Sequence, residues 1–68
     1  MTWCVEWNLS PQSGMDDFHI DTLEKIAEKN RRILEKGKAP TYFVIGYAPT
    51  LTEARQIASD YLAQHPRV

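Results

Sequence analysis

A strand followed directly by a capped helix, between residues 39 and 62, constrains this chain more than any other stretch. Residues 41–48 are rich in β-branched and aromatic side chains, the composition of a half-buried strand. Pro49 ends that run. Thr50 and Glu53 then have the spacing of a capping box, and apolar residues follow at helical spacing up to Leu62. The stretch therefore predicts a β-turn-α unit.

The first nine residues predict a second long strand, because apolar and polar side chains alternate along them. Trp3 and Trp7 lie on the apolar side of this alternation, together with Val5. Two readings of the tryptophans compete: an aromatic platform for a ligand, or two large core residues that face a helix. The alternation favours the core.

The segment between these two strands predicts a loop, a short element and a helix. Residues 10–15 are rich in turn formers, and residues 16–20 fit either a short strand or an early helical turn. We favour the strand, because two strands alone are barely stable. Asp21 and Glu24 have capping-box spacing, and Gly37 suits a left-handed helix end, so a helix is expected from there to about Lys36.

The predicted first helix has an apolar stripe and sorted charges. The stripe consists of Leu23, Ala27 and Leu34, with Ile26 and Ile33 beside it. Asn30 falls within the stripe, where an asparagine either sets the register of a helix pair or faces an edge; the edge position is favoured.

Acidic residues precede basic ones along this helix, which complements the helix dipole. The alternative is a basic patch for phosphates or an acidic partner, formed by Arg31, Arg32, Lys36 and Lys38. The net charge of −1 and the lack of interleaved aromatics and of a glycine-rich anion loop argue against nucleic acid as that partner.

These elements predict a single small α+β domain over residues 1–68. We expect a two-layer sandwich with the order β-β-α-β-α, in which a three-stranded sheet of spatial order 2-1-3 carries both helices on one face. If residues 16–20 are not a strand, the alternative is a βαβα chain with its two long strands parallel.

The far face of this sheet is the expected binding surface. A chain of 68 residues buries only about 60% of its unfolded surface, so its core is thin and added burial stabilises it. The 41–48 strand is apolar on both faces, which is unusual for a face that meets water. We therefore expect a self-associating protein-interaction module, a homodimer or a complex with another protein. The expected partner-binding residues are Glu6, Tyr42, Val44 and Gly46.

The sequence argues against an enzyme, a metal site or a cofactor. Cys4 is the only cysteine, which fits a reducing compartment, and neither it nor His19 nor His65 has a ligand spacing. The Asp16/Asp17 pair would point to opposite sides of an extended segment. Without a long apolar run or a signal-peptide pattern, a cytoplasmic protein with no membrane segment is expected.

Overall fold

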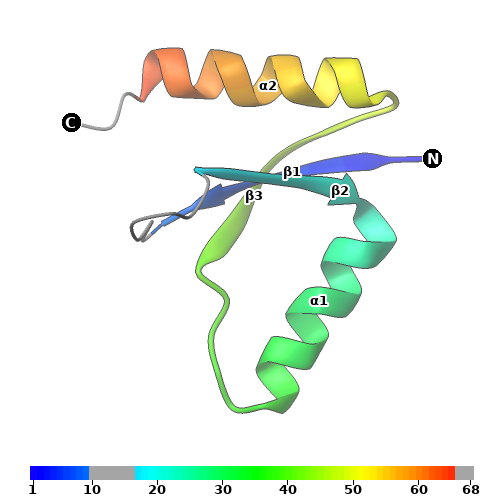
Figure 1. Cartoon of the computed structure of the whole chain (residues 1–68), viewed down its shortest axis with the longest axis vertical. Coiled ribbons are helices and arrows are strands. Elements are labelled where there is room, and N and C mark those ends of the chain that lie inside the picture. The colour runs from blue at the N-terminus through cyan, green and yellow to red at the C-terminus, as the bar shows by residue number, and fades with distance from the viewer. Residues whose placement is uncertain (10–16, 66–68) are drawn as a thin grey trace.

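The computed structural model describes residues 1–9 and 17–65, and it confirms the predicted order of elements (Figure 1). The predicted turn-rich loop at 10–15, Asp16 and the last three residues lie outside the described residues. The short second strand is confirmed. The elements are β1 (Trp3–Asn8), β2 (Phe18–Thr22), α1 (Leu23–Glu35), β3 (Tyr42–Ala48) and α2 (Leu51–Gln64).

The three strands form an antiparallel sheet in the order β2-β1-β3, as predicted. The cap of α2 is also as predicted, since the Thr50 hydroxyl accepts a hydrogen bond from the Glu53 amide at 3.2 Å. The cap of α1 differs by one residue. Thr22 stands there instead of Asp21, because β2 remains paired with β1 as far as Thr22. Gly37 ends α1 with φ at 74°, in the left-handed conformation that glycine adopts without strain.

The two helices lie on opposite faces of the sheet, which corrects the expected two-layer arrangement. In Figure 1, α2 runs along one side of the sheet and α1 descends from the other. Val5 packs with Ala54 and Ala58 of α2, whereas its neighbour Glu6 bonds to Lys29 of α1. Neighbouring residues of a strand point to opposite faces, so each face of β1 has its own helix.

The α2 side of the sheet holds the main apolar core. Its centre is a buried cluster of small and branched residues, and partly buried aromatic and branched side chains surround it. Trp7 lies at one end, where its ring centroid is 4.8 Å from that of Phe18 and 5.0 Å from that of Tyr61. Trp3 and Trp7 are therefore core residues, the reading that the alternation favoured. The buried cluster consists of Val5, Ala48, Ala54 and Ala58.

A β-bulge interrupts the pairing of β1 with β3. Val5 lies opposite Gly46, but Glu6 lies opposite Val44, so Ile45 is an extra residue. Beyond the bulge the alternation of faces is shifted by one. Tyr47 therefore points to the α1 side and is 56% exposed, although simple alternation predicts that it lies in the core.

The bulge also turns Gly46 toward α2. A Cβ atom at this position would lie 3.1 Å from Cγ2 of Ile57, closer than ordinary van der Waals contact. Gly46 is one of the residues expected to contact a partner at the far face of the sheet. The element that approaches it is instead the chain's own second helix.

Candidate functional site

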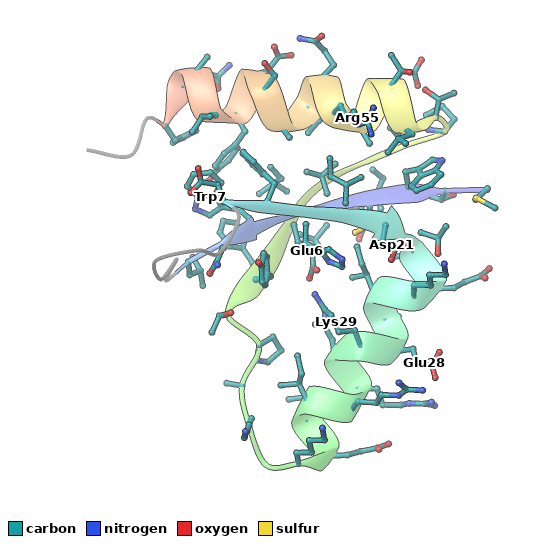
Figure 2. All side chains as sticks on the ribbon, in the orientation of Figure 1. Glu6, Trp7, Asp21, Glu28, Lys29 and Arg55 are labelled. Atoms are coloured by element: carbon teal, nitrogen blue, oxygen red, sulfur yellow. The ribbon has the colours of Figure 1, made fainter. Side chains whose placement is uncertain are left out.

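The α1 side of the sheet contains a buried glutamate surrounded by polar side chains. The Glu6 side chain is 0% exposed, and its Oε1 atom accepts a hydrogen bond of 2.6 Å from the ammonium group of Lys29. Asn30, the next residue of α1, donates a longer bond of 3.4 Å to Oε2. Figure 2 shows Lys29 extending from α1 toward Glu6, while Trp7 lies on the opposite side of the sheet. A buried carboxylate needs such partners, because an unpaired buried charge is costly.

His19 completes this cluster from β2, directly opposite Glu6. Its Nδ1 atom lies 3.2 Å from Glu6 Oε1 and 3.3 Å from Lys29 Nζ. One ring nitrogen cannot donate and accept at the same time. Nδ1 therefore accepts from Lys29 when it carries no proton, and donates to Glu6 when it carries one. In both states the charge of Glu6 has a partner.

The cluster also reaches β3 through Tyr42. The Lys29 ammonium lies 4.8 Å from the centre of the Tyr42 ring, a cation–π contact, and the His19 ring lies 6.0 Å from it. Glu6 and its neighbours thus connect α1 to all three strands. Asn30 faces this cluster through its amide nitrogen, while its Oδ1 atom is buried without a hydrogen-bond partner among the described residues.

The pKa of Glu6 lies below its ordinary value. Burial acts to raise this pKa, but the hydrogen bonds with Lys29, His19 and Asn30, together with the positive charge of Lys29, outweigh burial. The pKa of Cys4, which is buried on the same face, is raised by burial first and by the charge of Glu6 second. Burial and the raised pKa of Cys4 both favour the protonated thiol, which is the weaker nucleophile.

The lowered pKa of Glu6 predicts a loss of stability in acid. A carboxyl group whose folded pKa is depressed stabilises the fold above its unfolded pKa, about 4.5 here, and this contribution disappears as the pH falls through the folded value. We expect the free energy of unfolding to decrease as the pH drops below about 4.5, with a smaller slope in Glu6→Gln. Urea unfolding at a series of pH values measures both slopes. Equal slopes would show that Glu6 does not cause the acid sensitivity.

The two edges of the sheet differ in character. β2 is short and carries His19 and Asp21, and side chains of this kind protect an edge from pairing. β3 has seven residues, none of them charged, and it pairs with no strand other than β1 in residues 1–9 and 17–65. The exposed apolar side chains along it are Phe43, Val44 and Tyr47.

The expected partner-binding residues do not form one open surface. Glu6 is fully buried beneath α1, and Gly46 faces α2. Tyr42 is half-buried and contacts Lys29, whereas Val44 is exposed. Of these four residues, Val44 is therefore the exposed one, and Tyr42 is partly accessible.

The alternative basic patch is also divided. Arg32 and Lys36 share a hollow along α1 with Lys25 and Lys29, but Arg31 lines a different hollow. Arg31 and Arg32 also pair with acidic residues of α1, at 3.8 Å and 2.8 Å respectively. Both pairs are exposed and hence weak. Lys38 lies exposed beyond the end of the helix.

Comparison of the chain with models of protein families, with curated proteins and with solved structures finds no match. Within the described ranges, no group of three or more His, Cys, Asp or Glu side chains could hold a metal ion. Neither α1 nor α2 is long and apolar enough to cross a membrane.

Proposed function

We propose that this chain is a small non-enzymatic interaction module that self-associates through the free edge of β3. The observation that carries this proposal is the contrast between the two sheet edges: β2 is short and charged, whereas β3 is longer, uncharged and apolar. Exposed backbone N–H and C=O groups along such an edge are a template for another strand. The side chains beside them supply apolar contact.

A second copy is the partner that best fits this edge. Two identical strands can pair antiparallel about a twofold axis, so that the same residues contact each other from both sides. Because β3 has no charged residue, this pairing places no like charges opposite one another. The product is a continuous six-stranded sheet. A chain of this size gains stability from the additional burial, since its own core is thin.

The bulge at Ile45 limits the length of strand that can pair. It bends β3 and increases its twist, so a regular ladder cannot run along all seven residues. The exposed Val44 lies directly before the bulge and Tyr47 after it, both on the α1 side of the sheet. Apolar contact at these two positions thus adds to a short ladder of backbone hydrogen bonds.

The prediction is that Val44→Lys weakens the dimer at least tenfold and leaves helix content unchanged. The substitution brings two lysines close to the twofold axis, where they repel each other, while in one chain the exposed site leaves the new ammonium in water. Light scattering after size exclusion, at concentrations from about 1 μM to about 1 mM, gives the mass and the change in Kd. Circular dichroism reports helix content.

Ala63→Lys is the matched control, because it adds the same charge on the exposed surface of α2. It should leave the dimer intact. Hydrogen exchange locates the contact: amides of Tyr42–Ala48 should become more protected as concentration rises. A wild-type chain that stays monomeric throughout this concentration range would rule out self-association. A dimer that Val44→Lys leaves unchanged would place the contact elsewhere.

A further inference from the structure

The apolar face of α1 is wider than the sheet covers. Ile26 is buried against the sheet and Ile33 is half-buried, but Leu23 and Leu34 are 40% and 62% exposed. Ala27 lies between them and is exposed as well. The predicted apolar stripe therefore exists, but α1 is turned so that the edge of the stripe meets the sheet and its centre faces outward.

The spacing of this outward stripe is that of a helix-packing seam. Leu23, Ala27 and Leu34 stand at positions i, i+4 and i+11, which recur on one side of a helix as in a heptad pattern. A hollow lies over Ala27, lined by four residues at i, i+3, i+4 and i+7. Four residues at this spacing form the hole that receives one side chain of a facing helix. The lining residues are Glu24, Ala27, Glu28 and Arg31.

The charges beside the seam favour a second copy of α1 as the facing helix, packed in the antiparallel direction. Glu24 stands at the acidic start of α1 and Arg31 in its basic second half. If a second α1 packs antiparallel, each Glu24 lies near the Arg31 of the other copy, at two symmetric places. A parallel arrangement would put Glu24 beside Glu24 and Arg31 beside Arg31. In this antiparallel register, Leu34 of one copy lies beside Leu23 of the other, and the two Ala27 residues meet near the twofold axis.

We infer that α1 of one chain packs antiparallel against α1 of a second copy through Leu23, Ala27 and Leu34. This contact uses a different element from β3 and does not rest on the proposed function. The 13-residue helix is about 20 Å long, so the seam is short and the pairing weak. Chains that also pair through β3 assemble beyond the dimer, because the two contacts join different copies.

A charge-swap experiment tests both the contact and its direction. It uses the full chain carrying Val44→Lys, which weakens β3 pairing, and every α1 variant is compared with this same background. In this background the chain should still form a weak dimer at about 1 mM in sedimentation velocity. Glu24→Arg alone and Arg31→Glu alone should each weaken it roughly tenfold, because each places like charges together at both symmetric positions.

An equimolar mixture of the two single variants should restore the dimer. In the mixed antiparallel pair, the arginine of Glu24→Arg faces the glutamate of Arg31→Glu at one place. At the other place the unchanged Glu24 and Arg31 face each other, so both contacts are favourable.

Removing the apolar contact of the seam tests the proposed packing independently of the charges. Leu34→Gln, which keeps a good helix former at an exposed site, should abolish association with unchanged circular dichroism. A monomer in the Val44→Lys background, or a mixture no tighter than its components, would overturn the inference while leaving β3 pairing to its own test.

Discussion

Lys29→Met is expected to lower the free energy of unfolding by about 3 kcal/mol, one of the two largest effects that the structure predicts. Methionine has a similar length but cannot donate a hydrogen bond, so the carboxylate of Glu6 stays buried without its ammonium partner. Removing one member of a buried ion pair costs about 3–5 kcal/mol. The lower end applies because the Lys29 side chain is itself 32% exposed and water can take its place. Urea unfolding followed by circular dichroism measures the change.

Two further variants show whether burial of the charge is the cause. Arg32→Met removes a long cationic side chain from an exposed pair with Glu28 and should cost less than about 1 kcal/mol. The double variant Glu6→Met/Lys29→Met replaces the buried pair with two apolar side chains and should recover most of the loss, because no unpaired charge remains. A cost for Lys29→Met no greater than that for Arg32→Met would mean that Glu6 does not depend on its ion pair.

Trp7→Ala is expected to remove about 3–5 kcal/mol, enough to unfold much of the population. A domain of this size has a total stability on the order of 5 kcal/mol. The indole is buried and contacts Phe18 on β2 and Tyr61 on α2, so its loss opens a cavity that neither neighbour can fill. Trp7→Phe keeps an aromatic ring in place and should cost much less. Urea unfolding followed by circular dichroism measures the free energy of unfolding of both variants, Trp7→Ala and Trp7→Phe.

The control for this series is Tyr47→Ala in the Val44→Lys background. Tyr47 is an aromatic residue of the same sheet, but more than half of it is exposed, so its truncation should cost less than about 1 kcal/mol. The Trp7 variants are compared in the same background, which reduces the contribution of association through β3 equally for all of them. Similar losses for Trp7→Ala and Tyr47→Ala would contradict the assignment of Trp7 to the core.

Most of the secondary structure could be predicted because its signals are local. The hydroxyl of Thr50 caps α2 because it lies three residues before Glu53, and Gly37 ends α1 because glycine adopts a positive φ without strain. The strand order 2-1-3 followed from the rule that crossovers are right-handed. None of these features depends on where distant side chains lie.

The candidate site was harder to predict because its burial depends on pairs of distant residues. The alternation along residues 1–9 places Glu6 on the sheet face opposite the predicted helices, among the expected partner-binding residues. The predicted strand order is compatible with burial of Glu6. β1 is the central strand and has two faces to cover, and the chain has two helices, so one helix can cover each face. The residue that permits burial is Lys29, which stands 23 positions later. No local pattern connects the two.

The amino-acid sequence by itself determined the elements of this protein and their order, together with the Thr50 cap of α2 and the Gly37 end of α1, because capping, alternation and helical spacing act within a few residues. The tertiary structure alone decided which face each helix covers, where the bulge at Ile45 shifts the alternation, and which apolar side chains stay exposed on β3 and α1. These outcomes arise from packing between elements distant along the chain. A side chain is buried only when a second element lies over it.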